Sequence, residues 1–229
     1  MRFGLQKLTL LDFPGQVACT IFSRGCNFTC PFCHNASLVN GSDELPFTEQ
    51  EIVDFLKKRQ GILDGVCFTG GEPLLCSRVT DLAELAKSLG YKVKLDTNGS
   101  LPELLQKAVD KKLVDYVAMD IKTSPEKYAA VSGSDQALAA VKKSVEFLQR
   151  GATEFEFRTT VVNTLHELSD FAAIGQWIGA VKHYFLQPFA DSGDILSGNA
   201  ADFAVSNDFM QKALTEVRRF VPSAAIRGR

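Results

Sequence analysis

The sequence lacks any apolar run of the about 18 residues that a membrane-spanning helix requires. It also lacks the apolar core of a signal peptide, because it begins Met1-Arg2-Phe3-Gly4-Leu5-Gln6-Lys7. A charge excess is missing too, since 25 Lys and Arg residues face 27 Asp and Glu residues, for a formal net charge of -2. We therefore expect a cytoplasmic protein with no nucleic acid and no membrane as partner.

Internal repeats and low-complexity segments are absent from the sequence, as is any pairing of a nucleophile with a general base. Apolar residues make up 45% and charged residues 23%, which is typical of a globular protein. The length suits one domain over 1–229 with a large core. The end of the chain is locally basic, with Arg218, Arg219, Arg227 and Arg229. Such a cluster is typical of a solvated face or of a surface that attracts an acidic partner.

Three of the six cysteines stand in one short segment, Cys26-Asn27-Phe28-Thr29-Cys30-Pro31-Phe32-Cys33. No fourth cysteine completes a local set, whereas iron–sulfur clusters usually take four. Three protein ligands on a four-iron cluster leave one iron open, and an open position distinguishes a reactive metal site from a structural one. Because cytosolic thiols stay reduced, the segment predicts metal binding rather than disulfides.

A zinc knuckle with His34 as the fourth ligand is the alternative to an iron–sulfur cluster. It is less favoured, because His34 directly follows Cys33 and would strain a tetrahedral chelate. Cys19 and Cys67 lie in apolar, strand-like segments and are predicted to be core residues. The role of Cys76 stays open at this point.

Strand and helix patterns alternate along the chain. Six apolar segments predict strands at 17–22, 65–69, 92–96, 116–119, 154–162 and 183–187. Helical patterns follow them, at a capping box formed by Thr48 and Glu51 and then at 82–89, 101–112, 135–150, 168–181 and 207–220. Six β–α units predict an α/β fold with a parallel sheet and outer helices, curled toward a barrel but too short to close as eight strands do. The longest irregular stretch, 188–204, is expected beside the entrance to the barrel and able to move without affecting a metal site.

Polar motifs follow the predicted strands at one end of the sheet. They are the cysteine segment, Gly70-Gly71-Glu72-Pro73, Asp96-Thr97-Asn98-Gly99, Asp120-Ile121-Lys122, and the single residues Arg158 and His166. Ligands of parallel α/β folds bind at the carboxyl ends of the strands, so these motifs are expected to meet in one cleft. The two glycines would let the backbone approach a ligand, and Glu72 would accept hydrogen bonds from a cationic group.

Each of these motifs also has a structural interpretation. Asp96-Thr97-Asn98-Gly99 is a good turn sequence, and Asp120 with Lys122 can form an ion pair at the rim. His166 is equally consistent with a surface position at a helix start and with contact to a ligand.

The cysteine spacing, with an aromatic residue before the last cysteine, resembles the radical S-adenosylmethionine (SAM) superfamily. Segments 4–7, 11–15 and 24–35 are most similar to activases of glycyl radical enzymes, above all the anaerobic ribonucleoside-triphosphate reductase activating proteins. The motifs at 70–73, 96–99 and 120–122 also resemble pyruvate formate-lyase activating enzyme.

This resemblance implies a partial (β/α)6 barrel and one [4Fe–4S] cluster on Cys26, Cys30 and Cys33, with SAM on the open iron. It implies no catalytic side chain beyond the cluster and SAM. The SAM-binding residues that it implies are Phe32, Gly70, Gly71, Glu72, Asp96, Asn98, Asp120, Lys122, Arg158 and His166. By the same resemblance, a monovalent cation would lie near Asp96, Thr97 and Asp120.

The implied reaction is the reductive cleavage of SAM, followed by removal of a hydrogen atom from a backbone glycine of a partner glycyl radical enzyme. Flavodoxin or ferredoxin would donate the electron. The alternatives are a radical SAM enzyme for a small molecule, such as the deazaguanine-forming synthase, and an activase of pyruvate formate-lyase or another glycyl radical enzyme. A metal module without enzymatic activity is the third class.

Overall fold

The computed structural model describes residues 1–41, 44–191 and 193–228. One nine-stranded sheet has the order β3-β1-β2-β4-β5-β6-β7-β8-β9. Its six central strands run parallel and confirm the prediction of six strands followed by helices. They are β2 (Ala18–Ser23), β4 (Gly65–Gly70), β5 (Lys92–Thr97), β6 (Tyr116–Asp120), β7 (Glu154–Val161) and β8 (Tyr184–Pro188).

Three strands were not predicted from the sequence. β1 (Arg2–Thr9) pairs antiparallel with β2, and the two-residue β3 (Phe47–Thr48) pairs antiparallel with β1. β9 (Ala225–Ile226) pairs parallel with β8 at the other edge. Most of β1 is exposed or half-buried and two-residue strands carry no periodicity, so none of them has the apolar pattern that marks a buried strand.

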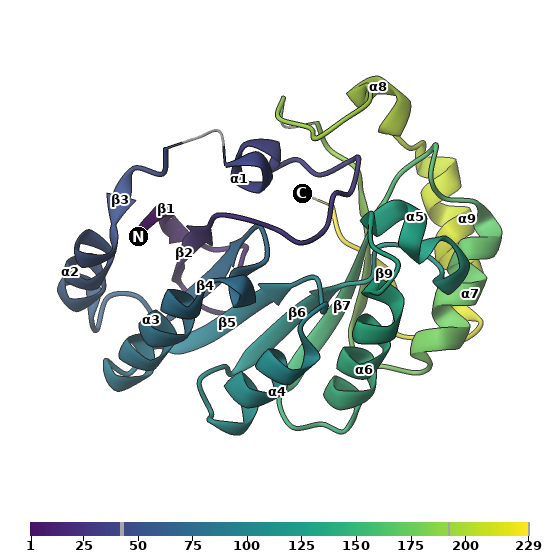
Figure 1. Cartoon of the computed structure of the whole chain (residues 1–229). Helices are drawn as coiled ribbons and strands as arrows, with labels where there is room; N and C mark the ends of the chain where they lie inside the picture. The colour runs from purple at the N-terminus through teal and green to yellow at the C-terminus, as the bar shows by residue number, and fades with distance from the viewer. Residues whose placement is uncertain (42–43, 192, 229) are drawn as a thin grey trace.

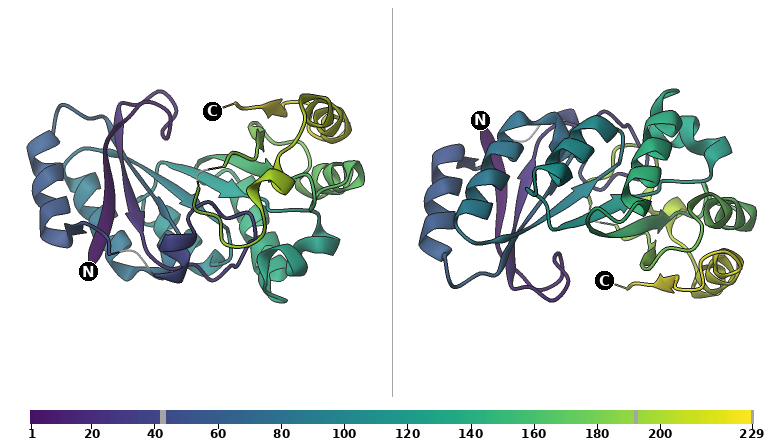
Figure 2. Two further views of the ribbon diagram at one scale, coloured as in Figure 1. Left: turned by 90° about the horizontal axis from the view of Figure 1, so that it is seen from above. Right: turned by 90° about the horizontal axis from the view of Figure 1, so that it is seen from below.

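Helices cover the outer face of the curved sheet, and the layers are visible in Figures 1 and 2. The long helices are α2 (Glu49–Arg59), α3 (Ser77–Ser88), α4 (Pro102–Asp110), α6 (Ala137–Gln149), α7 (Leu168–Ile178) and α9 (Asn207–Arg218). α2 begins at the predicted capping box of Thr48 and Glu51, and Pro102 occupies the first turn of α4. This arrangement is the α/β fold with outer helices expected from the alternating pattern.

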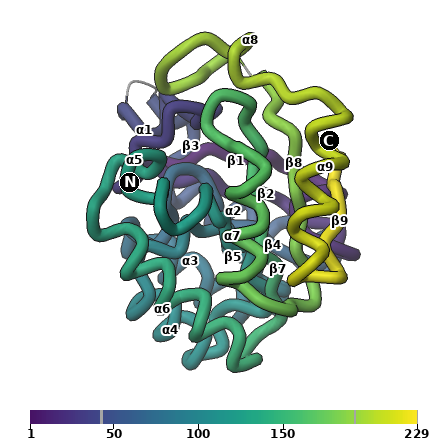
Figure 3. Tube along the Cα trace, turned by 90° about the vertical axis from the view of Figure 1, so that its right-hand side faces the viewer, coloured from purple at the N-terminus to yellow at the C-terminus, as the bar shows by residue number. Residues whose placement is uncertain are grey.

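Three short helices lie near the carboxyl ends of the parallel strands, at the top of Figure 1 and in the upper part of Figure 3. α1 (Ala36–Asn40) follows the cysteine segment, and α5 (Tyr128–Ser132) follows β6 after a 3-10 turn. α8 (Ala200–Phe203) lies inside the stretch that the sequence predicted to be irregular. Among the described residues, the helices are all too short or too polar to cross a membrane.

The concave side of the sheet is polar, unlike the core under the helices. Lys94 of β5 and Glu156 of β7 are each only 1% exposed although they carry charges. Buried charges require partners, since an unpaired ion in a protein interior is costly. The parallel sheet therefore encloses a set of ion pairs below the site formed at its carboxyl end.

Candidate functional site

A cavity of about 250 Å³ opens at the carboxyl ends of the parallel strands. The structure brings all but two of the predicted site residues to its wall: Cys26, Phe32, Cys30, Cys33, Gly70, Gly71, Asp96, Asn98, Asp120, Lys122 and Arg158. The other two, Glu72 and His166, lie behind the wall. Residues far apart in sequence thus meet in one site, as the positions of the motifs at the strand ends predicted.

The three cysteines of the segment after β2 line one side of this cavity. The backbone N–H of Cys33 donates to the Cys30 carbonyl (3.0 Å), and that of Thr29 donates to the Ser132 carbonyl of α5 (2.9 Å). Burial raises the pKa of the Cys30 thiol to about 11 and also raises the pKa of Cys26. The thiols are therefore poor free nucleophiles, whereas binding to a metal deprotonates them.

The fit of a metal group depends on how these sulfur atoms are spread. Among the described residues, no three His, Cys, Asp or Glu side chains are gathered closely enough to hold one metal ion. Three sulfur donors around a shared cavity suit a larger, multi-iron group with one iron left to face the cavity.

Gly70 and Gly71 pack against the start of the cysteine segment. A Cβ on Gly70, whose φ is 120°, would lie 2.2 Å from the Ser23 carbonyl oxygen, and one on Gly71 would lie 2.0 Å from that of Gly25. The Glu72 N–H donates to the same Gly25 oxygen (2.8 Å). Glycine is thus required here by the neighbouring backbone. Both glycines also line the cavity, so the close approach of a ligand that the sequence suggested stays a prediction.

Glu72 is fully buried and does not contact the cavity. Its carboxylate accepts hydrogen bonds from the Leu74 N–H (3.2 Å), the Thr97 hydroxyl (2.9 Å) and the Asn98 N–H (2.7 Å). Burial outweighs these bonds and raises the pKa of Glu72 to about 7. The expected contact with a cationic ligand is therefore replaced by a supporting role under the turn after β5.

Asn98 is the residue that Glu72 orients toward the metal side of the cavity. Its side-chain Nδ2 donates to the Cys26 sulfur (3.6 Å) and to the Asn27 side-chain oxygen (3.1 Å). A hydrogen bond to a ligating sulfur is one of the ways in which proteins adjust iron–sulfur centres. Asn98 thus belongs to the wall and also touches the cysteine segment.

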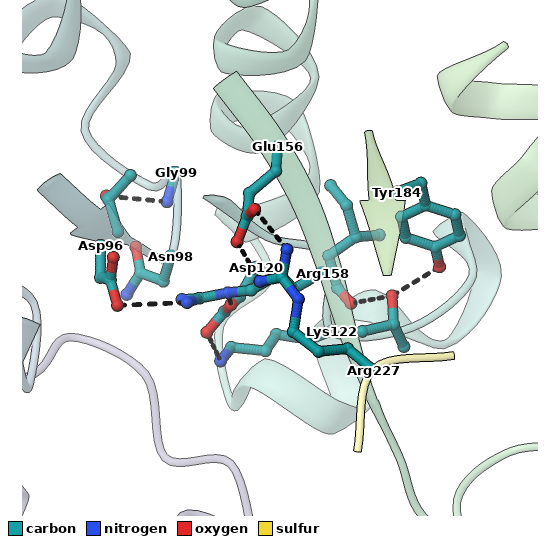
Figure 4. Close-up of polar contacts among 12 residues, drawn as sticks. Asp96, Asn98, Gly99, Asp120, Lys122, Glu156, Arg158, Tyr184 and Arg227 are labelled. Carbon is teal, nitrogen blue, oxygen red and sulfur yellow. Dashed lines mark hydrogen bonds and ion pairs between the residues drawn. The ribbon is translucent and has the colours of Figure 1, made fainter. Parts of the chain in front are cut away.

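An ion-pair network crosses the cavity floor, as Figure 4 shows. Arg158 Nη1 lies 3.1 Å from Asp96 Oδ2, and its Nε lies 2.9 Å from Asp120 Oδ1. Lys122 pairs with Asp120 at 2.9 Å, and the buried Lys94 pairs with Asp96. Burial alone would raise the pKa of Asp120, but the charges of Arg158 and Lys122 hold it well below its usual range. Both carboxylates are therefore ionised at neutral pH.

The predicted monovalent cation would have to share its oxygens with this network. Arg158 lies between Asp96 and Asp120, and the Thr97 hydroxyl donates to Glu72. A cation at that place stays a prediction, and it would require Arg158 to move.

His166 is buried, with 3% of its surface exposed, and lies below the segment that follows β6. The Val162 N–H donates to Nδ1 (3.0 Å), so Nε2 carries the proton and donates to the Lys122 carbonyl (3.0 Å). His166 is thus neither the surface residue nor the cavity-wall residue considered from the sequence. It supports the backbone that carries Lys122.

Two features of the site had no motif in the sequence. Arg227, at the end of the chain, lines the cavity. The stretch after β8 is hydrogen-bonded across the cysteine segment, from the Leu196 N–H to the Cys33 carbonyl (3.0 Å) and from the Ser197 N–H to the Pro31 carbonyl (3.1 Å). These bonds hold the stretch against the cysteine segment, and its independence from the metal site stays a prediction.

Comparisons with known proteins agree with this geometry. The model of the Radical SAM superfamily matches residues 20–171. A Methanocaldococcus jannaschii protein, named as a candidate glycyl-radical enzyme activating enzyme, is 31% identical over 81% of this chain and 78% of its own length. Pyruvate formate-lyase-activating enzyme of Clostridium pasteurianum is 30% identical over 57% of this chain and 56% of its own. The 7-carboxy-7-deazaguanine synthase of Hyperthermus butylicus is 36% identical over 39% of this chain and 38% of its own length.

Solved structures share the fold at low identity. TYW1 with a lysine-pyruvate adduct has a TM-score of 0.65 at 13% identity, covering 89% of this chain and 74% of its own. The protein anSMEcpe with bound AdoMet has a TM-score of 0.64 at 18% identity, covering 86% and 57%. These likenesses support the partial barrel and no particular substrate.

Proposed function

Because this chain belongs to the radical SAM superfamily, we propose that it is an activase that generates a glycyl radical in a partner enzyme. The observation that carries this proposal is the similarity, over most of both chains, to the Methanocaldococcus protein named as an activating enzyme of that kind. The anaerobic ribonucleoside-triphosphate reductase is the partner favoured by the motifs at 4–7, 11–15 and 24–35. Flavodoxin or ferredoxin is the proposed electron donor.

Membership of the superfamily implies a [4Fe–4S] cluster and SAM, and the cavity offers donors suited to both. Cys26, Cys30 and Cys33 would hold the cluster. When bound, the two groups supply one-electron cleavage of SAM and removal of a hydrogen atom from the substrate. Lys122 adds a positive charge next to the cysteines; its charge counters the burial that raises the pKa of Cys26 and of Cys30. We propose that Lys122 favours the thiolate state required for ligation.

The carboxylates and cations on the cavity floor suit a zwitterionic ligand. Asp96 and Asp120 are the anionic groups there, and Arg158 and Lys122 are the cationic groups. We propose that these four residues orient the amino, carboxylate and ribose groups of SAM, with Asn98 beside the cysteines. Because each of these charges already has a partner in the protein, the positions of the four side chains are fixed before SAM arrives.

The stretch after β8 would exclude water from the reacting groups. It covers the cysteine segment through two backbone hydrogen bonds, from Leu196 and Ser197. A reactive species in this cavity is thereby separated from solvent on that side, as radical chemistry requires.

The proposal is tested by incubating the reduced protein anaerobically with SAM and each candidate glycyl radical enzyme. Electron paramagnetic resonance should detect a radical on one partner, and the Cys30→Ala variant should give none. SAM cleavage without a radical on any candidate would reject the proposed function.

A radical SAM enzyme for a small molecule is the second candidate, favoured by the 36% identity to 7-carboxy-7-deazaguanine synthase over 39% of this chain. If that reading were correct, SAM cleavage would accelerate with a heterocyclic small molecule and would not respond to any partner protein.

A further inference from the structure

The end of the chain contributes a charged residue to the substrate cavity. β9 pairs with β8 at the edge of the sheet, and the Arg227 N–H continues this pairing by donating to the Leu186 carbonyl (3.0 Å). The segment is also fixed from behind, because Arg218 Nε donates to the Ala224 carbonyl (2.8 Å). Arg227 therefore has a defined place on the cavity wall, although no sequence motif marks it.

The guanidinium of Arg227 is held on two sides. Its Nη1 and Nη2 donate to the two oxygens of Glu156 at 2.7 Å each, and its central carbon lies 3.5 Å from the centroid of the Phe185 ring. Glu156 is 1% exposed and also accepts from the Tyr116 hydroxyl (2.9 Å). Figure 4 shows Arg227 and Glu156 beside Arg158 on the concave side of the sheet. Such a bidentate pair stacked on a ring fixes the orientation of the guanidinium.

This orientation leaves hydrogen-bond donors directed away from Glu156. The pair with Glu156 uses the two terminal nitrogens end-on, so the edge that carries Nε–H is not part of it. Both hydrogen bonds to Glu156 use the terminal nitrogens, Nη1 and Nη2, and the side chain is 33% exposed. Because Glu156 already balances its charge, a neutral acceptor suits this edge better than a second carboxylate does. A peptide carbonyl oxygen is such an acceptor.

The position of Arg227 also suits a chain that arrives from outside. Figure 2 shows the C-terminal segment and the β1–β2 connection on the same side of the molecule. Arg227 lines the cavity and is partly exposed, so that a segment of a partner protein can reach it.

We propose that Arg227 is a substrate-binding residue that donates hydrogen bonds to backbone carbonyl oxygens of the partner segment that carries the reacting glycine. This inference rests on the proposed function. It assigns the holding of the peptide to the C-terminal segment and leaves SAM to the charged residues of the cavity floor.

The test uses the partner that the wild-type protein activates. Arg227→Gln alone leaves Glu156 buried without its cation, so the informative protein is the double variant Glu156→Gln/Arg227→Gln, with Arg227→Lys beside it. Arg219→Gln is the matched control, because Arg219 lies on the surface of the same terminal region, where it pairs with Glu216 and lies over the Phe220 ring. Each protein is measured for iron content, thermal midpoint, SAM cleavage without partner, and radical formation against partner concentration.

We expect the partner KM to rise roughly tenfold in the double variant and in Arg227→Lys, which is the loss of about one hydrogen bond. Iron content and thermal midpoint should stay close to those of wild type in both variants, and Arg219→Gln should match wild type in every measurement. An unchanged partner KM would overturn the assignment, and so would a parallel loss of iron and thermal midpoint, which would make Arg227 a structural residue. Absence of a radical with wild type on every candidate would reject the proposed function and this assignment with it.

Discussion

The carboxylate of Asp194 accepts hydrogen bonds from both the backbone N–H (3.1 Å) and the hydroxyl (2.8 Å) of Ser37. Ser37 lies in the first turn of α1, and the residue before α1 provides no side-chain cap. Asp194 therefore caps α1 from the distant stretch after β8 and connects that stretch to the segment that carries the cysteines.

Replacing Asp194 with alanine should loosen this connection. Loss of a capping side chain typically costs about 1 kcal/mol, which corresponds to roughly fivefold more frequent local opening. We expect the cluster to assemble normally under nitrogen and to bleach several-fold faster in air than in wild type. The decay of its visible absorbance measures the rate. Asp202→Ala, an exposed change within the same stretch, should bleach as wild type does. Equal rates in all three proteins would show that the stretch does not shield the cluster.

The cysteines divide into two groups with different expected outcomes. Alanine at Cys26, Cys30 or Cys33 should remove the intact cluster, since each supplies one of only three sulfur donors on the cavity wall. Alanine at Cys19, Cys67 or Cys76 should retain it, because these buried thiols lie off that wall. Iron and sulfide analysis after anaerobic reconstitution measures the difference. Loss of iron in Cys76→Ala together with retention in Cys26→Ala would contradict the assignment.

Gly71→Ala should damage the metal site and not only SAM binding. The new methyl group would lie 2.0 Å from the Gly25 carbonyl oxygen, so the start of the cysteine segment must shift. Overpacking of this kind costs about 1–3 kcal/mol. Iron content and the free energy of unfolding should both fall, whereas Gly228→Ala, which meets no atom within 4 Å, should leave both unchanged. Normal iron content with weakened SAM binding would mean that a ligand, and not the backbone, requires the glycine.

Glu72 should make the stability of the protein depend on pH. Its pKa is about 7 in the folded state against 4.5 in the unfolded state, so the unfolded chain releases this proton at lower pH. Ionisation of the carboxyl group therefore lowers the free energy of unfolding as pH rises from about 4.5 to about 7, and the loss reaches about 3 kcal/mol above pH 7. In urea unfolding, Glu72→Gln should gain stability relative to wild type between pH 4.5 and 7. The exposed Glu84→Gln should follow wild type, and parallel curves for Glu72→Gln and wild type would refute the shift.

The sequence predicted those parts of the molecule that are determined by residues close together in the chain. Periodicity identified the six parallel strands, because strands buried on both faces are nearly continuous apolar runs. The spacing of Cys26, Cys30 and Cys33 predicted a shared site, and all three line one cavity. The positions of Asp96 and Asp120 at the ends of strands predicted that they would lie close together, and Arg158 contacts both. In each case the signal lies within a few neighbouring residues.

The parts that the sequence did not predict depend on contacts between distant segments. Glu72 accepts hydrogen bonds from Thr97 and Asn98, and His166 contacts the backbone of Lys122. Both are buried behind the cavity wall, although glutamate and histidine are common in binding sites. The sequence assigned Arg227 to a basic surface, and only the pairing of β9 with β8 places it at the cavity. The cap that Asp194 places on α1 spans 157 residues of sequence, so no local pattern could have indicated it.

The most direct test of the proposed function is whether a hydrogen atom from a partner's glycine passes to the 5′-deoxyadenosyl group of SAM, which then leaves as 5′-deoxyadenosine. The candidate partner is prepared with glycine deuterated at the α-carbon and incubated anaerobically with the reduced protein and SAM. Mass spectrometry of the released 5′-deoxyadenosine should show one deuterium per activated partner, and none when the partner's reactive glycine is replaced by alanine. Unlabelled 5′-deoxyadenosine from a partner that nevertheless stimulates SAM cleavage would contradict the account.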